Sequence, residues 1–494
     1  MTASTFSIGL SALATAQYGL NTTGHNIANV NTEGFSRQRV SFESREPQFI
    51  GVGYIGKGVI TQAVQRLSDQ FLVDQVRNST SSEARAGKMA SLLDQIDRQF
   101  GSALLAGGMQ DFFDGIADAN DDPRLMATRQ VLVERPQTMI NRFEDQEAQL
   151  NDVARSTNQQ MVGKVDEINN LTQALADINA DIGARPGVSS GDLPNDLFDQ
   201  RDQLLVRLAE KVGVQIQHRQ DGMLNVLIGD GQLVVAGANQ SQLATLPNSL
   251  DGTRTEIGVS VGNTVVQITD SVSGGELGAL IDFRDSALEP ARNAVGRLAA
   301  TIAITMNQQH REGMDLNGNL GGDLFNLPAP NISPAAANTG SVSIAFDTSN
   351  VDQLTTSDYR LRHDGTNFNL TRESDNTTQV LSGAGPFSVD GITITLGSAP
   401  ASGDDYLIQP TKLIPRGLSL ATTDPAQLAL AAPVRTEAAI TNIGDATIGT
   451  PEILDATDAA LLTSVNLVFN DPPTTYQIDG VGALQPFTSG ADID

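Results

Sequence analysis

Apolar side chains recur at alternating intervals of four and three residues near the start of the chain. The positions are Phe6, Leu10, Leu13, Gln17, Leu20, Gly24 and Ile27. This spacing is a heptad pattern with weak positions at Gln17 and Gly24, and it predicts a helix from about Ser4, as N-cap, to Asn29. At ~1.5 Å per residue, such a helix is roughly 40 Å long. Periodicity alone favours a helix that buries this stripe inside its own fold.

Helical periodicity continues through most of the first 330 residues. It predicts a helix over about 67–100, a helix start at 121–123, a long helix over 137–182 after Pro136, a short helix from 195 and another over about 276–313. The long segment carries one narrow apolar stripe among many Asn, Gln and Asp residues. Such a stripe indicates partner helices and not a globular core.

The period changes to two in the later parts of the chain. Apolar residues alternate on both sides of Asp221-Gly222, which predicts a hairpin in a small antiparallel sheet. From about Ser341, short alternating runs between Gly, Asp, Asn and Ser turns are typical of a sandwich or barrel. Residues 464–480 resemble the opening of this β-rich part and predict a second copy, which is incomplete at Asp494.

Together these segments predict an α+β multidomain chain. A rod of long helices, as a coiled coil or bundle, carries a small antiparallel sheet insertion and is followed by β-rich, sandwich-like modules. The expected limits are 1–35 for the N-terminal helix, 36–330 for the rod with its insertion around 212–270, 331–432 for a β-rich module and 433–494 for the start of a second one.

Composition and charge argue against several classes of partner and site. The formal net charge of −27 repels phosphate backbones and anionic lipid, so no nucleic acid is expected. The chain has no cysteine, which excludes disulfides and thiolate sites. No run approaches the ~20 apolar residues of a membrane span, so no membrane insertion is expected. The N-terminus also lacks the basic start and apolar run of a cleaved signal.

Candidate chemistry is sparse. The four histidines have no metal-site spacing, and no phosphate-loop or hydrolase motif occurs. Asp315, Asn317 and Asn319 resemble the start of a calcium loop, but the required Gly and bidentate Glu are missing, so a turn is predicted. No catalytic residue, metal ligand or cofactor is predicted. An extracellular polysaccharide-cleaving enzyme is the alternative from another class, although no carboxylate pair is fixed by the sequence.

The segment after the first helix is rich in Asn and Gly. It reads NIANVNTEGFSRQ over residues 26–38, and Asn and Gly there accept the positive φ of a helix stop. The segment resembles the N-terminal signature of flagellar axial proteins, which include rod, hook and junction subunits. Glu33 stands where that signature usually has Pro, and Phe35 stands where Tyr is frequent. Glu33 therefore loses the rigid turn that Pro would give.

Four further stretches are similar to the FlgK family of hook-associated proteins. They are GVGYIGKGV at 51–59, NDLFDQRD at 195–202, GGELGALIDFRD at 274–285 and NQQHREGMDLNG at 307–318. The resemblance extends from about Ser7 to Phe325. Members of the family end in a long helix that pairs with the N-terminal helix. No such segment is recognised after Glu437, so this chain is expected to be a fragment.

The resemblance implies a structural subunit of the bacterial flagellum, which joins hook to filament and is not an enzyme. It implies export without a cleaved signal, through the flagellar type III apparatus, to an extracellular position. The implied partners are hook subunits, the next junction protein, the flagellin filament layer, further copies in a ring-like helical layer, and an export chaperone whose usual C-terminal binding segment is absent here. A hook- or rod-type subunit and an extracellular β-module adhesin are the alternatives.

The same resemblance reverses the interpretation of the first helix. Its apolar stripe is then a contact surface for neighbouring subunits, which we call the seam: Phe6, Leu10, Leu13, Leu20 and Ile27. At ~25 cal/mol per Å² of apolar surface, leaving it in water costs several kcal/mol. The seam is therefore expected to become ordered when partners cover it. The residues expected to set the turn out of the helix are Asn26, Asn29, Asn31, Gly34 and Phe35.

Overall fold

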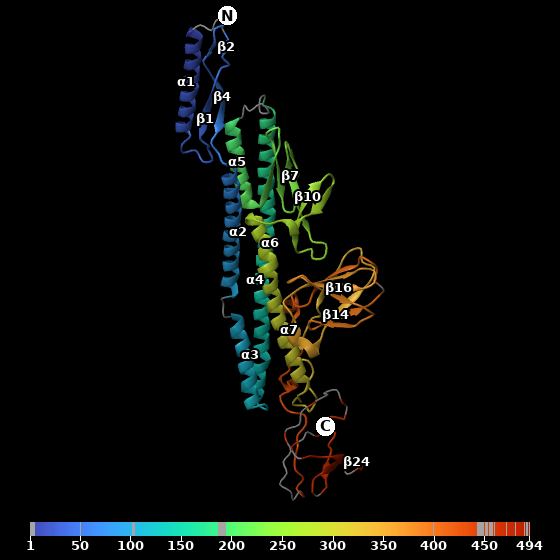
Figure 1. Cartoon of the computed structure of the whole chain (residues 1–494). Coiled ribbons are helices and arrows are strands. Elements are labelled where there is room, and N and C mark those ends of the chain that lie inside the picture. Colours follow the sequence, from blue (N-terminus) through green and yellow to red (C-terminus); the bar gives the residue numbers. More distant parts are fainter. Residues whose placement is uncertain are drawn as a thin grey trace. The chain divides into compact units, whose positions relative to one another are not determined.

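The computed structural model describes residues 5–49, 51–100, 104–185, 194–398, 400–441, 449, 453, 458, 460–470, 472–479, 481–488, 490 and 493. Long helices and small antiparallel sheets make up the chain, which confirms the α+β multidomain prediction (Figure 1). Two compact units form, each from three segments. The first comprises Met1–Ala103, Asp145–Arg297 and Pro330–Leu413, and the second comprises Leu104–Glu144, Leu298–Ala329 and Ile414–Asp494.

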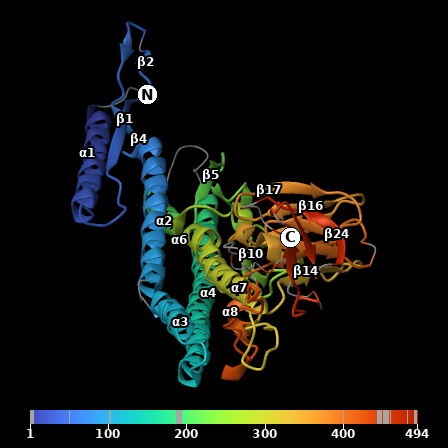
Figure 2. The same cartoon turned by 90° about the horizontal axis from the view of Figure 1, so that it is seen from below.

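The first unit begins with a helix and a β-ribbon, which we call the arm (residues 5–66). Its elements are α1 (Thr5–Ala28), β1 (Gln38–Ser44), β2 (Gln48–Phe49), β3 (Tyr54–Ile55) and β4 (Val59–Arg66). Strand β1 pairs antiparallel with β4, from Gln38↔Arg66 to Ser44↔Val59, and β2 pairs with β3. Figure 2 shows α1 lying alongside this ribbon. The helix was predicted, although its expected cap Ser4 lies outside the described residues; the four strands were not predicted.

Most of the long helices of the chain follow the predicted segments, but α3 was not predicted. They are α2 (Gln70–Phe100), α3 (Leu104–Asp121), α4 (Met126–Gly183), α5 (Asn195–Lys211), α6 (Gly275–Phe283) and α7 (Glu289–Arg311), with a π-helical turn at Arg284–Leu288 before α7. The predicted start of the long helix after Pro136 is wrong, because α4 begins at Met126 and Pro136 lies inside it. Buried neighbours such as Leu132, Met139 and Ile140 stabilise the helix on both sides of it. Their burial outweighs the hydrogen bond that Pro136 cannot donate.

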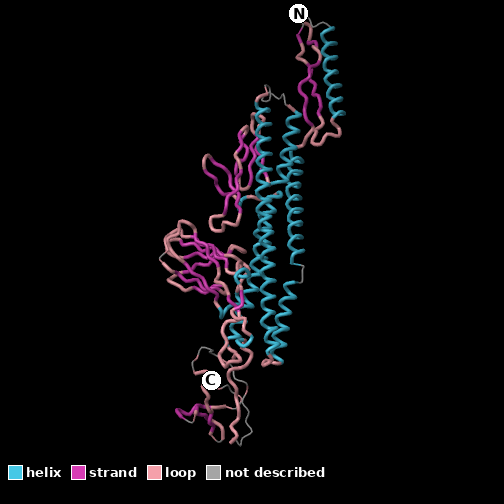
Figure 3. The backbone as a smooth tube through the Cα atoms, turned by 180° about the vertical axis from the view of Figure 1, so that it is seen from behind, coloured by secondary structure: helices cyan, strands magenta, loops and turns pink. Residues whose placement is uncertain are grey.

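The small sheet insertion packs on α4. Its strands are β5 (Val214–His218), β6 (Leu224–Ile228), β7 (Gln232–Ala236), β8 (Asn239–Gln240), β9 (Leu243–Pro247), β10 (Thr255–Val261) and β11 (Thr264–Gln267). The predicted hairpin around Asp221-Gly222 is confirmed, since β5 pairs with β6. Asn169 and Asn179 of α4 donate to the carbonyls of Leu243 and Leu224, each over 2.9 Å. These strands therefore gather along the long helices (Figure 3).

A β-sandwich completes the first unit. Its strands are β13 (Asn331–Pro334), β14 (Val342–Phe346), β15 (Tyr359–His363), β16 (Phe368–Arg372), β17 (Thr377–Leu381), β18 (Phe387–Val389), β19 (Ile392–Leu396) and β20 (Asp405–Gln409). One sheet has the order β13-β20-β15-β16-β17 and the other β14-β19-β18. Alternate residues, such as Leu361, Leu370, Ile394 and Ile408, are fully or almost fully buried. This alternation is what the sequence predicted for a two-layer β module.

The second unit has its own apolar core. Phe112 of α3 and Phe325 of β12 (Phe325–Asn326) are both fully buried, with ring centroids 6.0 Å apart. The unit also contains the first part of α4, the last part of α7, and α8 (Ile414–Gly417), β21 (Ser419–Leu420), β22 (Leu467–Phe469), β23 (Thr475–Ile478) and β24 (Val481–Pro486). Strand β22 pairs directly with β23, whereas β14 and β15 lie in different sheets. The second β module therefore stays a prediction.

Within the described residues, every helix is too short or too polar to cross a membrane.

Candidate functional site

The seam lies on the solvent side of α1. The exposed fractions of its side chains are 80% for Phe6, 57% for Leu10, 59% for Leu13, 71% for Leu20 and 69% for Ile27. A helix that folded against its own chain would bury such a stripe. The first unit therefore leaves a helix-long apolar surface without intramolecular cover.

The opposite face of α1, which contacts the ribbon, is built mostly from small and polar residues. The less exposed positions there include Ile8, Ser11, Thr15, Gly19, Thr22 and Asn26. Thr15 donates its hydroxyl to the Ser11 carbonyl over 2.7 Å, and the Ser11 hydroxyl accepts from the Val59 amide over 3.4 Å. The usual arrangement of an amphipathic helix is thus inverted, with mostly polar residues inside and apolar residues outside.

The inversion extends beyond the helix. Among described residues 5–91, every buried side chain is polar: Thr15, Gln38, Arg77 and Ser81. The ribbon and the start of α2 also expose large apolar side chains: Phe42, Phe49, Val52, Tyr54, Ile55, Ile60, Leu67, Phe71, Leu72 and Val76. So many exposed apolar side chains within one segment indicate a contact with another molecule.

Three of the five predicted turn residues, Asn26, Asn29 and Phe35, meet at the end of α1. Asn26 and Gln38 exchange two hydrogen bonds, of 2.8 and 2.9 Å, between the Asn26 amide group and the Gln38 backbone. Asn29 donates to the His25 carbonyl over 3.1 Å. The rings of His25 and Phe35 meet edge to face at 5.4 Å. The turn is therefore tied to both the helix and the first strand.

Gly34 and Asn31 complete the predicted set in different ways. Gly34 has φ +79°, a conformation that a residue with a side chain adopts only with strain, and it faces Gln203 of α5. Asn31 is exposed. The turn thus uses Gly34 for its backbone geometry.

Five residues, which we call the clasp, tie the ribbon to α5: Gln38, Arg66, Asp196, Asp199 and Asp202. Arg66 lies 2.9 Å from the Asp199 carboxylate and 2.5 Å from that of Asp202. Gln38 donates to Asp196 over 2.9 Å. The Arg66 and Asp199 side chains are only 12% and 8% exposed, so this pair is shielded from water.

Phe198 and Arg201 support the clasp from inside. The Arg201 guanidinium lies over the Phe198 ring, 4.6 Å from its centroid, and donates to the Gly222 carbonyl over 2.8 Å. Burial, together with the charge of Arg66 and against that of Asp202, lowers the pKa of Arg201 to about 10. The group remains charged at neutral pH and serves a structural role.

Sequence reasoning missed the clasp. A signal was present, because Asp196, Asp199 and Asp202 recur every three residues and so share one face of α5. Nothing in the sequence indicated that Gln38 and Arg66 would meet that face, since their pairing depends on the unpredicted β1–β4 ribbon.

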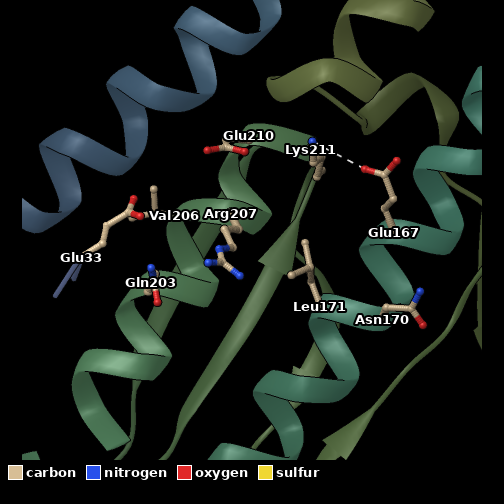
Figure 4. Close-up of a pocket in the computed structure, with 9 residues that line it drawn as sticks. All are labelled: Glu33, Glu167, Asn170, Leu171, Gln203, Val206, Arg207, Glu210 and Lys211. Carbon is tan, nitrogen blue, oxygen red and sulfur yellow. Dashed lines mark ion pairs between the residues drawn. The ribbon is translucent and has the colours of Figure 1, made fainter. Parts of the chain in front are cut away.

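An open recess of about 450 Å³ lies between α4 and α5, with Glu33 of the turn also in its lining (Figure 4). Lys211 in its lining is 3.5 Å from Glu167 and 2.9 Å from Glu276 of α6. Lys211 is thus already paired with carboxylates of the same chain. We therefore assign the recess a structural role.

The described residues contain no group of three or more side chains that could hold a metal ion. The Asp315 carboxylate accepts from the amides of Asn317 and Asn319, each over 2.8 Å. This confirms the predicted turn at the calcium-loop-like segment.

Replacing Arg66 with Gln is expected to loosen the arm. The change leaves the buried Asp199 carboxylate without its charged partner, which typically costs about 3–5 kcal/mol. Hydrogen exchange of the amides in 26–38 and 59–66 should accelerate, while exchange in α4 stays unchanged. The matched control is Arg85→Gln, whose pair with Asp282 is exposed and contributes only about 0–1 kcal/mol. Equal exchange in the two variants would show that the clasp does not hold the arm.

Comparison with known proteins places these features in context. The helical domain of flagellar hook-associated protein FlgK matches residues 89–325, the D2-like domain of flagellar hook-associated protein 1 matches 333–410, and the flagella basal body rod protein family matches 6–35. Flagellar hook-associated protein 1 of Salmonella typhimurium is 30% identical over 479 residues, covering 95% of this chain and 86% of that protein. The Escherichia coli protein of the same name is 30% identical over 430 residues, covering 85% and 78%.

A solved structure agrees with these relatives. The flagellar hook junction protein FlgK from Burkholderia pseudomallei superimposes with a TM-score of 0.67 at 29% identity. The match covers 72% of this chain and 66% of that chain, which is just under two thirds of the solved protein.

Proposed function

Since this chain belongs to the flagellar hook-associated protein 1 (FlgK) family, and so is a structural protein of the flagellar hook–filament junction, we propose that it assembles there through the seam of α1. The seam residues Phe6, Leu10, Leu13, Leu20 and Ile27 contact neighbouring axial subunits. The turn residues Asn26, Asn29, Asn31, Gly34 and Phe35, together with the clasp, direct α1 toward them.

The inverted burial of α1 carries this proposal. Five large apolar side chains face solvent, while the face that the chain itself covers is mostly small and polar. Burying one such side chain fully contributes about 1.5–3 kcal/mol. The isolated chain leaves these side chains exposed, whereas neighbouring subunits would cover them. Their burial therefore stabilises the assembly and not the isolated chain.

The proposed neighbours follow from a position between the tube of the hook and the tube of the filament. Hook subunits lie on one side, the next junction protein and the flagellin layer lie on the other, and further copies complete a ring-like helical layer. Contacts in which two different surfaces meet allow one subunit type to repeat in this way. We further propose an extracellular position, export without a cleaved signal with the help of a chaperone, and no catalytic role. The limits 331–432 and 433–494 remain our proposal for the β modules.

A hook- or rod-type subunit is the weaker alternative. The rod-protein match is confined to residues 6–35, whereas the helical-domain match covers 89–325. An adhesin is likewise disfavoured, because it gives no reason for an exposed heptad on α1.

Labelling of flagella tests the assignment. The chain has no cysteine, so a single Val380→Cys change on the exposed side of β17 provides one thiol for maleimide-gold. We expect gold at the boundary of hook and filament in cells that carry this variant in place of the native chain. Label along the filament or in the rod, with none at the boundary, would refute the proposed position. Unlabelled native flagella are the control.

A further inference from the structure

The charge of the arm is opposite to that of the rest of the chain. Residues 1–66 contain five basic and three acidic residues, a formal charge of +2. The remaining 26 basic and 55 acidic residues leave −29 for positions 67–494. Two copies at −27 each repel one another overall, so a contact between copies is favoured where the basic arm of one meets the acidic surface of the other.

Three arginines share the outer face of the ribbon. Side chains alternate along β1, and Phe42 points to the inner face beside Gly19 of α1. Odd-numbered residues of β1, such as Arg39, therefore point away from α1. Arg37 and Arg45 flank β1 and continue its pairing, since the Leu67 amide donates to the Arg37 carbonyl and the Arg45 amide donates to the Gly58 carbonyl, and all three arginines are exposed. The ribbon thus presents a basic face to solvent on the side opposite α1.

The structure places no carboxylate of the described residues against these three arginines. Within the described part of the chain, Arg37, Arg39 and Arg45 take part in no ion pair. Arg66, on the inner face, is by contrast held in the clasp. The chain has 58 acidic residues, so partners for the outer arginines are plentiful on a second copy.

The end of the ribbon adds an apolar anchor. Phe49 and Tyr54 are 59% and 74% exposed, and their ring centroids are 5.3 Å apart. Val52, between them, is also exposed. Arginine beside exposed aromatic residues is the composition that recurs at the centres of protein interfaces.

We propose that the outer face of the ribbon, through Arg37, Arg39 and Arg45 with the tip around Tyr54, binds the acidic surface of a second copy of this chain. This inference rests on the proposed function, because it requires copies to be neighbours in the junction. It adds a contact that is distinct from the seam and that depends on charge, and is therefore sensitive to salt. A positive surface on a negative one is a head-to-tail contact, which repeats around a ring.

Cross-linking from the outer face tests the contact in assembled flagella. Gln65 is exposed and pairs with Arg39 across the ribbon, so Gln65→Cys places a single thiol beside the arginines. With a thiol-reactive photo-cross-linker, we expect a product of two copies whose second peptide comes from an acidic surface in 67–494. Cross-links that reach only hook or filament subunits, or none at all, would overturn the inference.

Charge variants separate this contact from general repulsion. In the Gln65→Cys background, Arg37→Ser, Arg39→Ser and Arg45→Ser together should lower the yield of the two-copy product about tenfold. The control removes three exposed body arginines, by Arg98→Ser, Arg155→Ser and Arg435→Ser, and so has the same net charge. We expect the control to keep its yield, and equal losses in the two triples would refute the ribbon contact. If the two triple variants lose yield equally and gold labelling still marks the junction, the ribbon contact is refuted while the proposed function stands.

Discussion

Replacing Leu10, Leu13 and Leu20 with serine should abolish incorporation at the hook–filament junction while the chain itself folds normally. The three side chains are 57%, 59% and 71% exposed, so their loss removes little burial within the chain. In the assembly they are expected to be covered, at about 1.5–3 kcal/mol for each side chain. The summed loss corresponds to at least about a thousand-fold weaker association.

Two measurements on the same variant separate assembly from folding. Thermal unfolding followed by circular dichroism should match that of the unmodified chain, and electron microscopy should show hooks without attached filaments. The control is Val261→Ser, Val265→Ser and Val266→Ser, which removes three similarly exposed apolar residues from β10 and β11. That control should assemble. Normal filaments on the seam variant would remove the basis of the proposed function.

Replacing Lys412 with Met should strongly destabilise the first unit. The Lys412 ammonium is 2.7 Å from Glu289 of α7 and 3.2 Å from Asp251 in the loop between β9 and β10. Its side chain is only 5% exposed. Methionine fills the space but leaves two largely buried carboxylates without their cation, which typically costs about 3–5 kcal/mol.

The pH dependence of this variant identifies the cause. Burial by itself raises the pKa of Asp251, but the charge of Lys412 and hydrogen bonds from Thr253 outweigh it and lower that pKa to about 2. Since this value lies below the ordinary 3.8, the carboxylate stabilises the fold above about pH 4, and that contribution is lost as the pH falls toward 2. Without Lys412, the pKa of Asp251 rises toward or above its ordinary value, so this contribution shrinks or disappears and the variant gains little from the higher pH.

Melting temperatures at pH 7 and pH 3 provide the measurement. The difference between Lys412→Met and the unmodified chain should be large at pH 7 and smaller at pH 3. Arg360→Met is the control, because the Arg360 side chain is 51% exposed beside Asp405 and its pair contributes little. An unchanged melting temperature at pH 7 for Lys412→Met would show that the buried cluster does not hold the unit together.

Local periodicity predicted helices and strands correctly where one face of the element differs from the other in polarity. The heptad over Phe6–Ile27 predicted α1, and alternation around Asp221-Gly222 predicted the β5–β6 hairpin. The same signal could not reveal which face of α1 points outward, because periodicity is identical for a core and for an interface. Only the family resemblance favoured the outward orientation.

The failures have a common physical origin in long-range contacts. Strands β1 and β4 bury polar residues such as Gln38 and expose apolar ones such as Phe42 and Ile60, which obscures the alternation signal. Their pairing also joins segments about twenty residues apart. Pro136 is a strong local helix breaker that tertiary packing overrides. The clasp joins Arg66 to Asp199 and Asp202, more than 130 positions later, which no local pattern encodes.

Helix α1 uses one face to pack on the ribbon and presents another face for the proposed contact with neighbouring subunits. Contacts inside the arm depend on residues such as Ser11, Thr15 and Gly19, whereas recognition depends on a different set of positions. Substitutions in the outward set can accumulate without disturbing the inward set. Such a helix can be refitted to altered neighbours over evolution, or by design, while the body that carries it keeps its shape.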